Sequence, residues 1–135
     1  MVFLEFAFIF ICGAIGYGSI EMLWRGYTHW TMLLLGGLCL YLIYIISTRM
    51  NDALWKKLLM CASVVSCLEF VVGCLINLRL GWAVWDYSDM PMNLFGQICP
   101  TFCLMWLLLS LPCVYISRFI YTFVFRPNMK KEKIT

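Results

Sequence analysis

The strongest constraint on the fold lies in residues 58–79, which read LLMCASVVSCLEFVVGCLINLR. This run is long and apolar enough to cross a membrane as a helix, since about 20 residues span the hydrocarbon. Glu69 stands near its middle, where an ionisable side chain costs about 2.5–3.5 kcal/mol on insertion scales. On a helix, Glu69 shares one face with residues at steps of three and four, which are Ser66, Gly73 and Asn77. We expect other membrane helices to surround this polar face.

Composition places the whole chain in the membrane class. Of its 135 residues, 64% are hydrophobic and 13% are charged, whereas soluble domains carry about 25% charged residues. A water-soluble core of this length could not hide so much apolar surface. Because lipid requires backbone hydrogen bonds within each segment, the sequence predicts an all-α integral membrane four-helix bundle.

Four apolar segments are expected to cross the membrane within a single domain, residues 1–125. They are residues 2–24, 31–48, 58–79 and 98–119, and the last can continue toward residue 125. Ser88 or Asp89 before Pro91 is typical of a helix start, and Pro112 should kink the fourth segment. Small residues predict close helix approach, at positions 13, 16, 18, 36 and 37.

Basic residues set the predicted orientation. Four spans put both termini and the connection at 49–57 on one side, which holds seven cations: Arg49, Lys56, Lys57, Arg126, Lys130, Lys131 and Lys133. The other side holds Arg25 and Arg79. The excess of Lys and Arg predicts cytoplasmic termini and a basic cytoplasmic tail at 126–135. Each half has a Glu in its first helix and an aromatic outer connection, which suggests a parallel hairpin repeat.

Cysteine and histidine do not predict a metal site or a cofactor. The eight cysteines lie mostly inside apolar runs, where a free thiol behaves as a small hydrophobe. Cys99 and Cys103 are four residues apart, but no second Cys/His pair matches their spacing. No Ser-His-Asp set, P-loop or GxGxxG motif appears, and we expect no catalytic residues and no nucleic-acid partner.

One candidate constellation is Glu21, Arg25 and His29, which follow one another at steps of four. If the helix continued past Gly26, the three would share a face, and Glu before Arg is the favourable order for an ion pair. The pair could be structural, pinning the first helix to the interface. Alternatively, Glu21 could be a gate or substrate carboxylate partnered by Arg25.

The second candidate pairs Glu69 with Asn77, either as interhelical hydrogen bonding or as a functional intramembrane carboxylate. The third lies in the connection 80–97, where Asp86 stands between Trp85 and Tyr87. Aromatic faces beside carboxylates attract organic cations, although an interfacial aromatic belt is the plainer explanation for Trp82. Asp86 could instead cap the turn or pair with an arginine, Arg25 or Arg79.

Two motifs give the chain a family resemblance. They are EMLWRGYTHW, beginning at Glu21, and WDYSDMPMNLFGQ, beginning at Trp85. With them, the chain resembles the small bacterial membrane proteins described as putative ABC-transporter permease, type IV, or CmpB-like, over all but its tail. The resemblance implies a bacterial cell membrane location and a cytoplasmic ATPase partner. It also implies these site residues: Glu21, Arg25, His29, Trp30, Glu69, Asn77, Trp85, Asp86, Tyr87, Asn93 and Gln97.

These observations favour a small multi-pass transport or channel-like subunit. Glu21 and Glu69 would line a cavity open to the outer side, guarded by Trp85, Asp86 and Tyr87, for a cationic or polar small molecule. One four-helix chain encloses little volume, so a homo-oligomer or a membrane complex is expected. The alternatives are a non-transporting accessory or interaction protein, and an intramembrane lipid-acting enzyme that brings Asp86, His29 and Glu21 together.

Overall fold

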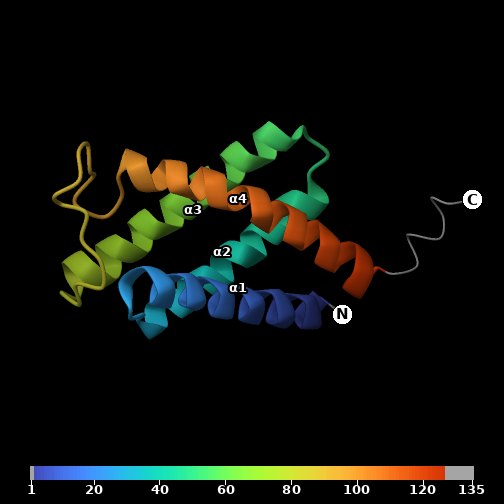
Figure 1. Ribbon diagram of the computed structural model, residues 1–135, viewed down its shortest axis with the longest axis horizontal. Helices are drawn as coiled ribbons and strands as arrows, with labels where there is room; N and C mark the ends of the chain where they lie inside the picture. The colour runs from blue at the N-terminus through green and yellow to red at the C-terminus, as the bar shows by residue number, and fades with distance from the viewer. Residues whose placement is uncertain (1, 127–135) are drawn as a thin grey trace, which may run out of the picture.

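The computed structural model describes residues 2–126 as a bundle of four long helices (Figure 1). They are α1 (Val2–Arg25), α2 (Trp30–Arg49), α3 (Leu54–Gly73) and α4 (Pro100–Ile120). Wider π-helical turns extend α3 as η1 (Cys74–Arg79) and α4 as η2 (Tyr121–Phe125). No strand occurs within residues 2–126, so the predicted all-α bundle is confirmed. Nearly all of the predicted basic tail lies outside the described residues.

All four helices are long and apolar enough to cross a membrane. With its π-helical extension η1, the third helix runs over Leu54–Arg79, and with η2 the fourth runs over Pro100–Phe125. The third therefore begins four residues before the predicted start at Leu58. The helix start predicted at Ser88 or Asp89 is wrong, because those residues lie in turns. The fourth helix begins instead at Pro100, where the missing N–H of proline costs no hydrogen bond.

Glycines bring α1 and α2 together. A Cβ on Gly13 would lie 2.6 Å from the backbone oxygen of Gly36, and one on Gly37 would lie 2.8 Å from that of Phe10. Only residues without side chains allow the two backbones to come so close. Gly16 departs from the prediction, because a Cβ added there would have no neighbour within 4 Å.

The two ends of the bundle differ. The described chain begins at Val2 and ends at Arg126 at the same end of the bundle, which we call the terminal end (Figure 1). The connections 26–29 and 80–99 lie at the opposite end, the loop end (Figure 1). α1 packs mainly on α2, whereas α4 packs on α2 and α3. α1 and α4 converge at the terminal end, where Phe8 meets Phe125 edge-to-face at 5.7 Å. There Arg126 Nη2 also lies 3.4 Å from Glu5 Oε1.

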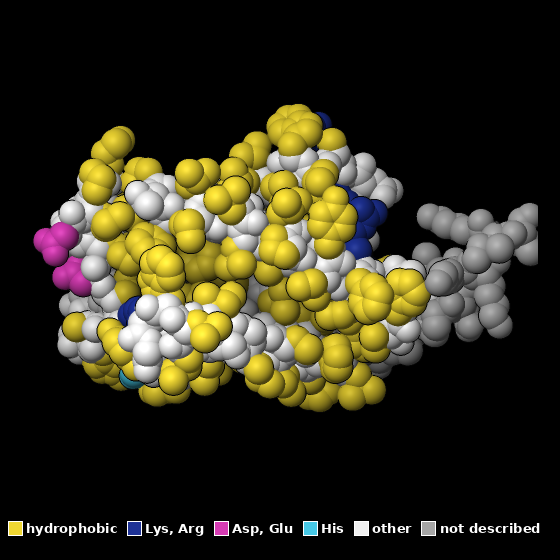
Figure 2. All heavy atoms as spheres, in the orientation of Figure 1, with side chains coloured by type: hydrophobic (Ala, Val, Ile, Leu, Met, Phe, Trp, Pro, Cys, Tyr) yellow, Lys and Arg dark blue, Asp and Glu magenta, His cyan; other side chains and the backbone are white. Residues whose placement is uncertain are grey.

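The connection at 80–99 folds into a compact cap on the loop end. Its backbone turns through left-handed conformations at Gly81 and Gly96, and also at Ala83, Met92 and Phe95. Such conformations cost energy for residues other than glycine and persist only when surrounding contacts hold them. Acidic side chains gather on this cap, at the end of the molecule away from the termini (Figure 2).

Candidate functional site

Glu69 is the most deeply buried acid in the described chain, with 1% of its surface exposed. Both of its oxygens accept hydrogen bonds. Tyr87 of the cap donates its hydroxyl to Oε1 at 2.9 Å, and Trp106 of α4 donates its indole N–H to Oε2 at 2.7 Å. A carboxylate on α3 therefore holds a helix and a connection that are distant in the sequence.

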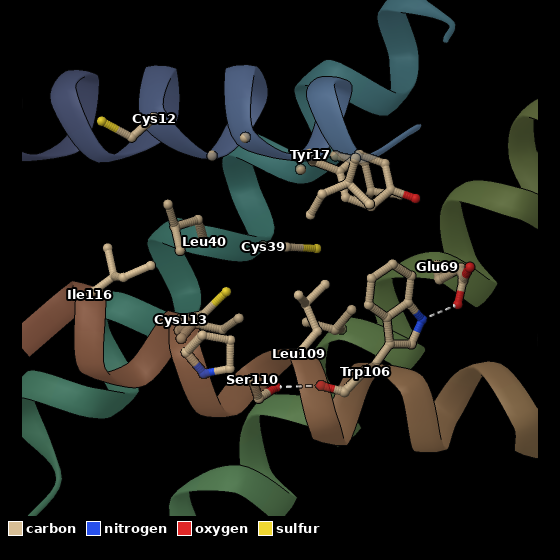
Figure 3. A pocket seen from close by; sticks show the side chains of 18 of the residues that line it. Cys12, Tyr17, Cys39, Leu40, Glu69, Trp106, Leu109, Ser110, Cys113 and Ile116 are labelled. Carbon is tan, nitrogen blue, oxygen red and sulfur yellow. Dashed lines mark hydrogen bonds between the residues drawn. The ribbon is translucent and has the colours of Figure 1, made fainter. Parts of the chain in front are cut away.

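A cavity of about 380 Å³ opens beside Glu69, and all four helices contribute to its walls. In Figure 3, α1 and α4 face each other across it, with α2 behind. Glu69 and Trp106 lie at one end, while Cys12 and Ile116 lie toward the other (Figure 3). Most of the remaining lining is aliphatic, cysteine or glycine. Among the residues predicted for the site, Glu69 alone belongs to the lining of this cavity in the described chain.

Tyr17 connects this cavity to another buried acid, Glu21. Its ring lies 5.8 Å from the ring of Trp106, and its hydroxyl donates to Glu21 Oε1 at 3.3 Å. The hydroxyl points toward the Glu69 end of the cavity (Figure 3). Glu21 and Glu69 are therefore linked through aromatic side chains at the loop end.

Glu21 forms the predicted ion pair with Arg25. Arg25 Nη2 lies 2.9 Å from Glu21 Oε1, and its Nη1 donates to the backbone oxygen of Val84 in the cap at 3.0 Å. Thr28 donates to the other Glu21 oxygen at 2.7 Å. The pair thus ties the end of α1 to both connections at the loop end.

His29 does not share the helical face of Glu21 and Arg25. Gly26 takes a left-handed φ of 76°, which ends α1. His29 instead precedes α2, where its Nδ1 accepts the backbone N–H of Thr31 at 3.3 Å. Its ring and that of the exposed Trp30 lie within 6 Å of the Trp82 ring. This arrangement is typical of an aromatic belt at the membrane boundary.

Asn77, Trp85 and Gln97 hold the cap on α3. Asn77 donates to Gln97 Oε1 at 2.9 Å and accepts from the backbone N–H of Val84 at 2.7 Å. The Trp85 indole donates to the backbone oxygen of Gln97 at 3.1 Å. Asn77, which was predicted to share a polar face with Glu69, lies in the π-helical turns of η1. It serves the cap and makes no hydrogen bond to Glu69.

Asp86 and Asn93 form the turns of the cap. Asp86 Oδ1 accepts from both the side chain and the backbone N–H of Ser88. These bonds lower the pKa of Asp86, which is exposed. Asn93 donates to backbone oxygens at Ser88 and Met90 and accepts from Gly96 N–H at 2.9 Å. Asp86 was predicted to bind a guest, to cap the turn or to pair with an arginine, and its hydrogen bonds to Ser88 are those of a turn cap.

Tyr87 differs from its neighbours because it reaches the bundle interior. Its ring stacks on Phe102 of α4, with centroids 4.3 Å apart and planes 11° from parallel. Burial, together with the neighbouring Glu69 carboxylate, raises the pKa of Tyr87 above its ordinary value. The phenol therefore stays protonated and serves as a donor to Glu69.

Sequence reasoning missed Tyr17 and Trp106. Tyr17 stands four residues before Glu21, the spacing of one helical turn, which could have indicated the contact. Nothing in the local sequence distinguishes Trp106 from an ordinary apolar residue, because its partner lies 37 positions away. Within residues 2–126, no cluster of three His, Cys, Asp or Glu side chains could hold a metal ion.

Sequence reasoning also missed two buried charges at the terminal end. Glu5 accepts from the Tyr44 hydroxyl at 3.3 Å. Lys57 is 4% exposed and donates to the backbone oxygen of Ser47 at 3.2 Å. Neither is part of the cavity lining.

Comparison with known proteins gives a family and no close relative. No curated protein matches this chain, and no solved structure matches it. One family model matches residues 6–134, and its description is "Putative ABC-transporter type IV". The match covers both motifs that carry the resemblance and, apart from the first residues of α1, all four apolar helices. This chain therefore belongs to that family of ABC-transporter-related membrane proteins, as its motifs predict.

Proposed function

We propose that this protein is a small membrane transport subunit that binds a guest molecule in the cavity beside Glu69. The observation that carries the proposal is the position of Glu69, which is buried at one end of a 380 Å³ cavity between membrane-length helices. A carboxylate at such depth is expensive and marks a functional site by default. A guest with a cationic or hydrogen-bond-donating group would offset that cost.

The geometry leaves room for such a group at Glu69. A carboxylate offers about four acceptor positions, and Tyr87 and Trp106 each occupy one. An ammonium group could therefore bind without displacing either donor. Trp106 and Tyr17 place aromatic rings at the same end of the cavity, and aromatic faces attract cations. These features support a cationic guest more than an anionic one.

Tyr87 supports coupling between the guest and the cap. It joins Glu69 to the 80–99 connection, so a guest that draws Glu69 away would weaken the attachment of the cap. We propose that this connection faces outward and that both termini lie in the cytoplasm of a bacterial cell membrane, following the distribution of Lys and Arg. The cap would then form the outer cover of the site.

Partners are part of the same proposal. Large apolar side chains remain exposed on α1 and α4, including Leu23 and Phe119, and they suit contacts with lipid, a second copy or another membrane subunit. Only Met50–Ala53 separates α2 from α3, which is short for docking an ATPase. An ATPase partner would therefore have to engage the basic tail or another subunit of the complex.

The test is a titration of decyltrimethylammonium into the purified protein in lipid nanodiscs, followed by tryptophan fluorescence. Glu69→Gln should weaken binding by about tenfold or more, which is 1.4 kcal/mol. The matched control is Asp52→Asn, which removes an exposed acid at the terminal end that pairs with Lys56 at 3.8 Å. Equal affinity in Glu69→Gln and the unaltered protein would remove Glu69 from the site.

A second candidate is an accessory protein that transports nothing. The observation that favours it is that both Glu69 oxygens are already paired within the chain, as expected of a carboxyl that only joins helices. This candidate predicts that no cationic guest binds the unaltered protein at any concentration below micelle formation. A lipid-acting enzyme has less support, because the described hydrogen bonds of Asp86, His29 and Glu21 join none of them to another.

A further inference from the structure

We infer that the guest is a single-chain amphiphile with a cationic ammonium head, and that it enters from the membrane through a window between α1 and α4 at Gly16. This inference rests on the proposed function, because it assigns the head group to Glu69. It adds the class of molecule, the direction of entry and the residue that keeps the window open.

The window is defined by exposed residues that also line the cavity. Gly16 and Ile20 come from α1, and Ile116 comes from α4. Ile20 is 45% exposed and Ile116 is 51% exposed, so the cavity rim reaches the side of the bundle. Figure 2 shows a hydrophobic recess on this face of the molecule. In a membrane, the sides of membrane-length helices face acyl chains.

Contacts close the cavity toward both ends of the bundle. At the terminal end, the Phe8–Phe125 ring contact and the Glu5–Arg126 ion pair join α1 to the end of η2. At the loop end, the Tyr17 and Trp106 rings meet, and Tyr87 covers Glu69. A guest that came from either aqueous side would have to break one of these sets of contacts. Entry from the side breaks neither.

Gly16 is the residue that leaves the side open. Gly13 and Gly18 on the same helix face α2, where an added Cβ would meet Leu40 or Leu33 within 2.6 Å. An added Cβ at Gly16 would meet nothing within 4 Å, although Gly16 belongs to the cavity lining. Helix packing therefore does not require glycine at position 16. The missing side chain widens the gap between α1 and α4.

The lining selects an amphiphile over a small polar cation. Among the described residues that line the cavity, Glu69 is the one charged residue, and most of the others are apolar. A fully hydrated cation would lose its water without replacement over most of the cavity. A chain with one ammonium group would place its apolar part against the aliphatic walls and its charge on Glu69, so the two parts match the two kinds of surface.

The test compares three probes in nanodiscs: tetramethylammonium, decyltrimethylammonium and the uncharged decanol. We expect decyltrimethylammonium to bind more tightly than either of the others by about tenfold or more. Gly16→Leu, which fills the window, should weaken its binding by a similar factor, and Gly16→Ala should have a smaller effect. The matched control is Ser19→Leu, which adds the same side chain to an exposed part of α1 outside the cavity lining.

The outcomes separate this inference from the proposed function. If Glu69→Gln weakens binding but Gly16→Leu does not, or tetramethylammonium binds as well as the long-chain probe, the lateral amphiphile site is wrong while the transport proposal stands. If no probe binds the unaltered protein, both are wrong. Thermal unfolding of each variant, read by circular dichroism, keeps a folding defect from being taken for lost binding. If Gly16→Leu unfolds early, Ile116→Trp replaces it as the blocking variant.

Discussion

Trp106 Nε1 donates to Glu69 Oε2 across 2.7 Å, and this bond joins α4 to the buried acid of α3. The Trp106 ring also meets the Tyr17 ring of α1 at 5.8 Å. The side chain of Trp106 therefore joins its own helix, α4, to two others, α1 and α3, at the loop end of the cavity. Replacement of Trp106 should therefore lower the stability of the bundle and leave one oxygen of Glu69 without its hydrogen-bond donor.

Trp106→Phe should destabilise the bundle by about 2 kcal/mol, since hydrogen bonds to charged groups contribute about 1.5–3 kcal/mol. Phenylalanine retains an aromatic ring but cannot donate to Glu69. Thermal unfolding in detergent, monitored by circular dichroism, would measure the loss. The control is Trp24→Phe, at a side chain on the same bundle that is 76% exposed. Equal midpoints for the two variants would contradict the prediction.

Tyr87 predicts a pH dependence of stability. Burial, with the Glu69 carboxylate beside it, raises the pKa of Tyr87. The folded protein therefore keeps a phenol proton that the unfolded chain releases at about pH 10. The resulting stability is fully present below that pH and falls as the pH rises above it, because the unfolded state then binds fewer protons.

Tyr87→Phe should remove this component of the pH dependence. The measurement is unfolding at several pH values between about 8 and 11, with the difference between the variant and the unaltered protein plotted against pH. The control is Tyr27→Phe, at an exposed tyrosine of the other loop-end connection. A difference that stays constant over this range would show that Tyr87 titrates normally in the folded protein.

The Glu21–Arg25 pair should be worth more than an ordinary surface pair. Its two side chains are 8% and 21% exposed and lie 2.9 Å apart, so water screens them weakly. A double-mutant cycle of Glu21→Gln and Arg25→Gln should give a coupling energy of about 1–3 kcal/mol. The Asp52–Lys56 pair has the same spacing in sequence but is 42% and 53% exposed at 3.8 Å. It should give less than about 1 kcal/mol, and equal couplings would contradict the prediction.

Gly13 and Gly16 should respond oppositely to alanine. A Cβ at Gly13 would lie 2.6 Å from a backbone oxygen of α2, so Gly13→Ala should destabilise the α1–α2 contact by about 1–3 kcal/mol. Gly16→Ala places its methyl in open space and should leave stability unchanged or raise it by up to about 1 kcal/mol. Thermal unfolding of the two variants side by side measures the contrast, and similar losses would contradict it.

The sequence was sufficient to predict features that depend on a single segment, such as the four helices and the Glu21–Arg25 ion pair. The four apolar runs predicted the four helices, because lipid leaves an apolar segment few structures other than a helix. The Glu21–Arg25 pair followed from its spacing of four residues. Glu69 and Asn77, predicted to share one polar face, serve different partners: Glu69 joins Tyr87 and Trp106, and Asn77 joins Gln97.

The cap at 80–99 shows what local reasoning could not predict. Asp86 and Asn93 are predicted as ligands for a guest, and in the structure their side chains close turns within the connection. Turn formation depends on backbone angles such as the left-handed φ at Met92 and Phe95, which no residue type at those positions indicates. The predicted helix start at Ser88 or Asp89 failed for the same reason.

Chain order and hydrophobicity were enough to determine a membrane bundle with an acid inside it, because the transfer of side chains into lipid depends on each segment alone. The cavity depended on tertiary packing. Glycines at 13, 36 and 37 hold α1 on α2, whereas α4 packs on α2 and α3, and the space between α1 and α4 stays open beside Glu69. That space follows from the way whole helices fit together, so no segment read by itself could show it.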